Sequence, residues 1–90
     1  MQNYKTSIGV YDSITGVLID TYTFASDARC KQINDRRAMS YAKDLYLNAR
    51  IADLANQYGE VIYRLVDDGI INPLDKYVFE ISDNKQNNNL

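Results

Sequence analysis

The 90-residue sequence contains no histidine and no tryptophan, one cysteine and one proline. Without histidine, the chain cannot form a Ser-His-Asp triad or a Cys-His pair, the usual means of activating a nucleophile. A single cysteine without histidine also cannot supply the ligands of a structural zinc site. The four glycines are scattered and form no phosphate-binding loop. We therefore expect no catalytic residue, no metal site, no cofactor, and a protein that is not an enzyme.

The lone cysteine and the absence of long apolar runs bear on the compartment. Cys30 has no second cysteine to pair with, which fits a reducing environment, and we interpret it as incidental. No apolar run approaches the ~20 residues that a membrane-spanning helix needs. The first residues, Met1–Lys5, are not followed by the hydrophobic segment of a secretory signal. These features predict a cytoplasmic protein that does not bind a membrane.

Charge is unevenly distributed along the chain, although the net charge is only −2. The charged residues of 51–90 are mostly acidic, whereas those of 29–50 are mostly basic. The candidate basic patch consists of Arg29, Lys31, Arg36, Arg37, Lys43 and Arg50. Three interpretations remain open: a solvated helix face, a surface for an acidic protein, and a nucleic-acid contact.

Three segments are predicted to be strands. Residues 4–10 alternate between apolar and polar side chains, and residues 17–24 are rich in β-branched and aromatic residues. Between them, Asp12 and Gly16 favour a tight turn at 12–16, so we expect an antiparallel hairpin. Residues 76–82 alternate again and are predicted to join the same sheet. The predicted fold is α+β, with a three- to four-stranded antiparallel sheet packed on one long helix. Residues 1–82 form one domain, and the polar residues 83–90 are predicted to be a disordered tail.

The long helix is predicted to begin near Asp35, after a short first turn, and it has two apolar stripes. Leu47, Ile51, Leu54 and Tyr58 form a stripe of large residues, which we assign to the sheet and core. A second stripe, mostly alanine, lies on nearly the opposite side and is the candidate interface with a partner or a second copy. It consists of Ala38, Tyr41, Ala42, Leu45, Ala49 and Ala52. The alternative is that both stripes are covered by the chain itself.

Residues 60–67 are the most ambiguous segment. The large stripe continues in phase through Val61, Ile62 and Leu65, which predicts a helix kinked at Gly59. The same residues are β-branched enough to form a strand after a helix-ending glycine, and this alternative stays open.

Eight tyrosines and only two phenylalanines give the chain many side chains of the kind favoured at binding surfaces. In general character it resembles small phage or mobile-element accessory proteins: compact, rich in tyrosine and asparagine, and without catalytic residues. The resemblance implies a protein-binding inhibitor or regulator that occludes a host protein or nucleic-acid-processing complex, and we expect a homodimer. The alternatives are a nucleic-acid-binding regulator using residues 29–50, and a structural subunit.

Overall fold

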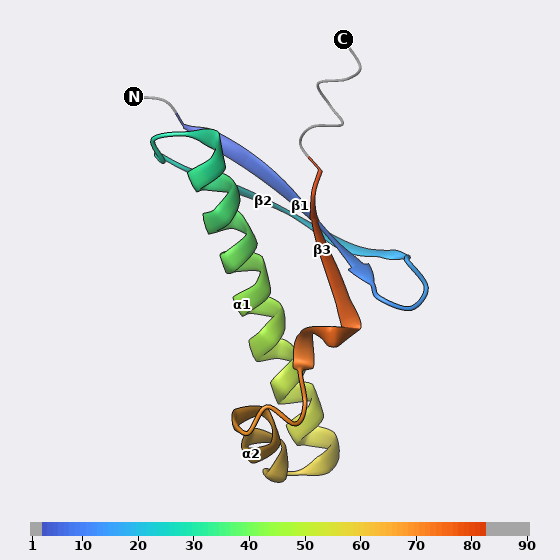
Figure 1. Cartoon of the computed structure of the whole chain (residues 1–90). Helices are drawn as coiled ribbons and strands as arrows, with labels where there is room; N and C mark the ends of the chain where they lie inside the picture. Colours follow the sequence, from blue (N-terminus) through green and yellow to red (C-terminus); the bar gives the residue numbers. More distant parts are fainter. Residues whose placement is uncertain (1–2, 83–90) are drawn as a thin grey trace.

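The computed structural model describes residues 3–82, and these form a hairpin, two helices and a last strand (Figure 1). The elements are β1 (Tyr4–Asp12), β2 (Leu18–Ser26), α1 (Lys31–Tyr58), α2 (Val61–Asp67), the 3-10 turn η1 (Pro73–Lys76) and β3 (Tyr77–Ile81). Within the described residues the sheet has three antiparallel strands in the order β2-β1-β3. The predicted α+β fold is confirmed, and the predicted tail lies outside the described residues.

The hairpin turn forms for the reason that the sequence indicates. The Asp12 carboxylate accepts hydrogen bonds from the backbone N–H groups of Ile14 (2.8 Å) and Thr15 (2.9 Å). Gly16 adopts a positive φ of 74°, which a residue with a side chain rarely adopts. The turn fixes the pairing of β1 with β2, which is antiparallel from Tyr4 opposite Ser26 onward.

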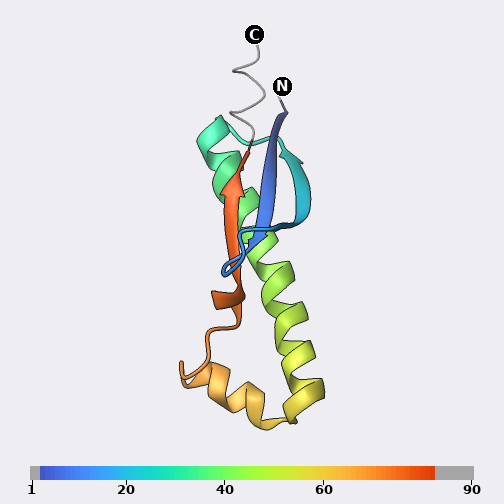
Figure 2. The same ribbon diagram turned by 90° about the vertical axis from the view of Figure 1, so that its right-hand side faces the viewer.

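The side chains of the sheet alternate as predicted between a covered face and an open face. Thr6, Ile8 and Val10 of β1 are fully buried on the side of α1. In β3 the odd-numbered residues are half-buried on the same side, whereas Val78 and Glu80 are exposed. Figure 2 looks onto the open face, with α1 behind the strands. One layer of helix therefore covers one face of the sheet only.

Two residues of the alanine stripe, Ala38 and Ala42, pack against the sheet. Ala38 and Ala42 are 1% and 0% exposed and form the core cluster with Ile8 and Val10. The assignment of these two alanines to a partner interface is therefore wrong. A methyl side chain lets the helix backbone approach the strands closely, and the half-buried aromatic residues at the edges of the sheet then fill the remaining volume.

The helix begins at Lys31, four residues before the predicted start, because a buried polar network holds its first turn on the sheet. Asn34 is fully buried and donates hydrogen bonds from Nδ2 to Thr6 Oγ1 (2.7 Å) and to the Phe24 carbonyl (3.3 Å). Its Oδ1 accepts a hydrogen bond from the Ser26 hydroxyl. Asn34 thus joins α1 to both strands of the hairpin instead of capping a helix.

The C-terminal half of α1 extends beyond the sheet. A helix of 28 residues is about 42 Å long, whereas the nine-residue β1 spans about 30 Å. The chain must return to place Tyr77 of β3 opposite Asp12 of β1. Gly59 makes the reversal with φ 90° and ψ −177°, so α1 ends there instead of continuing with a kink. Residues 61–67 are helical and not a strand, and they form α2.

Candidate protein-binding surfaces

The six predicted interface residues do not share one surface: two are buried and four are exposed. Ala38 and Ala42 lie in the core, whereas Tyr41 and Leu45 are 49% and 39% exposed and Ala49 and Ala52 are also exposed. Tyr41 contacts Phe24 of β2, with 5.5 Å between ring centroids. Tyr41 therefore flanks β2. For the four exposed residues a partner contact stays a prediction.

The predicted basic patch is also not one surface. Lys31 is engaged in the polar network, since its Nζ lies 2.6 Å from Asp35 Oδ1. Arg37 extends toward the end of β2, with Nη1 3.4 Å from Ser26 Oγ. Arg36, Lys43 and Arg50 follow one another at intervals of seven along α1 and share a different side of the helix. Only this row of three retains the geometry of a linear binding surface, while Arg29 lies outside α1.

Several tyrosines pack between α1 and the sheet. Tyr46 makes edge-to-face contacts with Tyr22, Tyr77 and Phe79, at centroid distances of 5.9, 4.8 and 5.8 Å. Burial, together with a hydrogen bond from its hydroxyl to Asp20 (3.1 Å), raises the pKa of Tyr46. A raised pKa keeps the hydroxyl protonated, so this ring is a neutral donor that ties α1 to β2.

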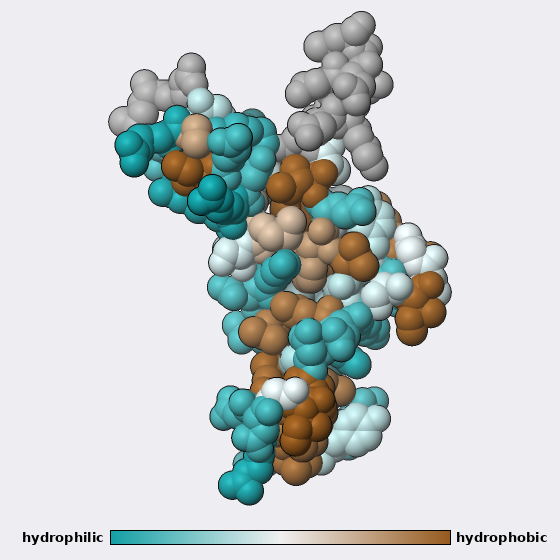
Figure 3. All heavy atoms as spheres, in the orientation of Figure 1, coloured by the Kyte–Doolittle hydropathy of each residue, from teal (hydrophilic) through white to brown (hydrophobic). Residues whose placement is uncertain are grey.

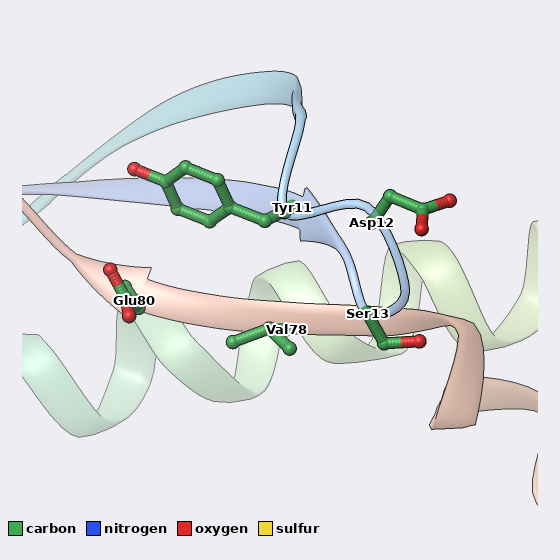
Figure 4. Close-up of a pocket in the computed structure, with 6 residues that line it drawn as sticks. Tyr11, Asp12, Ser13, Val78 and Glu80 are labelled. Carbon is green, nitrogen blue, oxygen red and sulfur yellow. The ribbon is translucent and has the colours of Figure 1, made fainter.

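The open face of the sheet carries a shallow hollow of about 340 Å³ beside the hairpin turn (Figure 4). Its labelled walls are Tyr11, Asp12 and Ser13 of the hairpin and Val78 and Glu80 of β3. The Tyr11 ring covers Gly9, where an added Cβ would lie 2.9 Å from ring carbon Cε1. Hydrogen bonds from the backbone N–H groups of the turn lower the pKa of Asp12, which favours the carboxylate over the acid. Asp12 is therefore a structural residue of the hairpin turn at the edge of this hollow.

A different surface is formed by the part of the molecule that projects past the sheet. We call residues 51–70, which comprise the end of α1, α2 and the turn after it, the helical arm. Leu54 and Ile62 are buried where the two helices pack. Large apolar residues nevertheless stay exposed along the arm: Tyr58 (65%), Val61 (53%), Tyr63 (53%) and Ile70 (68%). Figure 3 shows hydrophobic residues gathered over this end of the molecule, with hydrophilic ones beside them.

The charge of the helical arm is negative. It contains four acids, Asp53, Glu60, Asp67 and Asp68, and one base, Arg64, all of them exposed. Exposed apolar side chains surrounded by carboxylates complement a partner surface that has apolar depressions and a basic rim. Sequence reasoning placed Tyr58 and Val61 in the core because their periodicity continues that of α1. The glycine at 59 was the signal that the periodicity stops there.

The part of the chain that the structure describes, residues 3–82, has neither a cluster of metal ligands nor a membrane-spanning helix. No three histidine, cysteine or acidic side chains in that range come close enough together to hold a metal ion. None of the helices there has the length and apolar character needed to span a bilayer. Comparison of the chain with protein-family models, curated proteins and solved structures returned no match.

Proposed function

We propose that the chain is a non-catalytic protein-binding module that inhibits or regulates a larger protein by covering part of its surface. The observation that supports this proposal is the helical arm, where four large apolar side chains are more than half exposed. Exposed apolar groups of this size are favoured at contact surfaces because their removal from water stabilises a complex.

The negative charge of the arm favours a class of partner. Proteins that handle nucleic acid have surfaces rich in lysine and arginine, since these residues neutralise phosphates. An acidic arm with apolar anchors can occupy such a surface and exclude the nucleic acid. The proposed partner is therefore a nucleic-acid-processing protein with an apolar depression inside its basic surface.

The test is capture of a partner from nuclease-treated lysate by the immobilised full chain. We expect a protein that is retained by wild type and lost with the double variant Tyr58→Ser/Ile70→Ser. Ile14→Ser is the matched control, because Ile14 is 92% exposed but lies in the hairpin turn. Asp67→Lys/Asp68→Lys should also weaken capture, and cations at a helix C-terminus do not disturb the helix. Equal capture by the arm variants and wild type would contradict the proposal.

A second candidate function is nucleic-acid binding through the row Arg36, Lys43 and Arg50. The row spans 14 residues of α1, about 21 Å, and among residues 3–82 none of the three forms an ion pair. Binding of this kind should weaken steeply with salt and be lost in Arg36→Glu. Fluorescence anisotropy of a labelled oligonucleotide measures both, and salt-insensitive binding would exclude the nucleic-acid function.

A further inference from the structure

The outer edge of β2 is an unpaired strand nine residues long. It contains no proline, lysine or arginine, the residues that most often block the edge of a sheet. Its side chains on the open face at Thr21, Thr23 and Ala25 are small. The edge is therefore accessible to another strand, and its backbone decides how such a strand would pair.

The hydrogen bonds of β1 show which amides of β2 point outward. The Ser82 N–H donates to the Ser7 carbonyl and the Ser13 N–H to the Lys76 carbonyl, so odd-numbered residues of β1 bond toward β3. Even-numbered residues of β1 then bond toward β2, opposite Asp20, Tyr22, Phe24 and Ser26. It follows that the N–H and C=O groups of Thr21, Thr23 and Ala25 face away from the sheet. The Thr21 N–H already donates to Asp20 Oδ1 (2.8 Å), so the outward N–H groups of Thr23 and Ala25 are the ones that can pair with another strand.

Two opposite charges, Asp20 and Arg37, lie near opposite ends of this edge, on either side of Thr23. The Asp20 carboxylate is on the α1 side, where it accepts the hydrogen bond of Tyr46, and Arg37 reaches Ser26 at the other end of β2. Among residues 3–82, neither Asp20 nor Arg37 has an ion-pair partner. If two copies of β2 pair antiparallel with Thr23 opposite Thr23, residue 20 of each copy lies opposite residue 26 of the other. Asp20 of one copy then meets Arg37 of the second, and the contact occurs twice.

The aromatic residues on the α1 side fit the same register. With Thr23 on the two-fold axis, Tyr22 of each copy is opposite Phe24 of the other. Tyr41, which is half-exposed and already touches Phe24, lies beside this pair on α1. The second copy would cover it together with Leu45, the other exposed large residue of the stripe.

We propose that two copies of this chain associate through the edges of β2, with Thr23 on the two-fold axis, to form a continuous six-stranded sheet. A second copy fits this edge because the two-fold axis places Asp20 of each copy near Arg37 of the other. The same axis places Tyr22 of each copy opposite Phe24 of the other. This interface is separate from the helical arm and does not depend on the function proposed for it.

Cysteine cross-linking of the full chain, with Cys30→Ser to remove the native thiol, tests the register. In the proposed dimer the two Thr23 Cα atoms are about 5.5 Å apart, within disulfide range. The two Thr21 Cα atoms are offset by four residues and are more than about 13 Å apart. We expect oxidised Thr23→Cys to form a covalent dimer and Thr21→Cys to stay a monomer. Cross-linking of both variants to the same extent, or of neither, would overturn the register.

Charge reversal tests the interface without reliance on a disulfide. Light scattering of the wild type should give twice the 10.3 kDa chain mass at high micromolar concentration. Asp20→Arg and Arg37→Asp should each raise the dimer dissociation constant by about tenfold or more, because two attractive pairs become repulsive. The double variant should recover dimerisation, and circular dichroism should show that all three variants are folded. A monomeric wild type, including one whose edge pairs with a different protein, overturns the proposal, and so does failure of the double variant to recover.

Discussion

Replacement of Asn34 by alanine gives the most direct test of what holds α1 on the sheet. The change removes two donated hydrogen bonds, to Thr6 Oγ1 and the Phe24 carbonyl, and one accepted from Ser26. Thr6 Oγ1 keeps its contacts with Asp35 and Lys31. Not all the partner groups lose their last hydrogen bond. The loss in the free energy of unfolding is therefore worked from the net contribution of each hydrogen bond, and not from the larger penalty of a buried unsatisfied group.

The magnitude follows from three bonds at about 1 kcal/mol each, a loss of about 3 kcal/mol. Alanine is the better helix former, and at this interior position it recovers about 0.5 kcal/mol. We expect a net loss of about 2.5 kcal/mol in the free energy of unfolding. The total free energy of unfolding of a 90-residue chain is about 5–13 kcal/mol, so this loss should shift the unfolding midpoint clearly.

Urea unfolding followed by circular dichroism measures the loss, at one fixed chain concentration because self-association would add to the stability. The matched control is Asn48→Ala, the same substitution at an exposed position of α1. It should be neutral or stabilising by about 0.5 kcal/mol. If Asn34→Ala is no more destabilising than Asn48→Ala, the buried network does not hold the helix in place.

Three further predictions concern the core, the end of α1 and the dependence on pH. Ala42→Arg places a charge in the core and should abolish the helical signal in circular dichroism, whereas Ala49→Arg on the exposed stripe should keep it; equal loss would contradict the assignment of faces. Gly59→Ala meets no atom within 4 Å but must adopt φ 90°, so thermal unfolding should show a loss of about 1–3 kcal/mol, and an unchanged midpoint would mean that the reversal does not need glycine. Burial acts to raise the pKa of Asp35, but the hydrogen bonds from Lys31 and Thr6 outweigh it and hold the pKa below the ordinary value of 3.8. The stabilisation by Asp35 is therefore complete above its unfolded-state pKa and lost as the pH falls through the lower folded-state pKa; Asp35→Asn should reduce the acid sensitivity of unfolding below about pH 4, and an identical acid limb would count against the network.

The strands and the hairpin turn could be predicted from the sequence because their signals are local. Alternation places Thr6, Ile8 and Val10 on one face, and Asp12 with Gly16 makes the turn without help from distant residues. The candidate interface was only partly predictable. Periodicity shows that α1 has two apolar stripes, but both stripes are compatible with a sheet, and nothing local distinguishes Ala42 in the core from Ala49 on the surface.

Sequence alone thus determined the class of fold, the order of the elements and the residue types that the chain lacks, since these depend on residue type and short-range spacing. Tertiary structure decided which stripe of α1 meets the sheet, because close approach favours alanine over larger residues. It also decided that α1 ends at Gly59, where a helix longer than the sheet must let the chain return to β3. The acidic arm and the open edge of β2 exist only as consequences of that arrangement, and the two proposed binding surfaces rest on them.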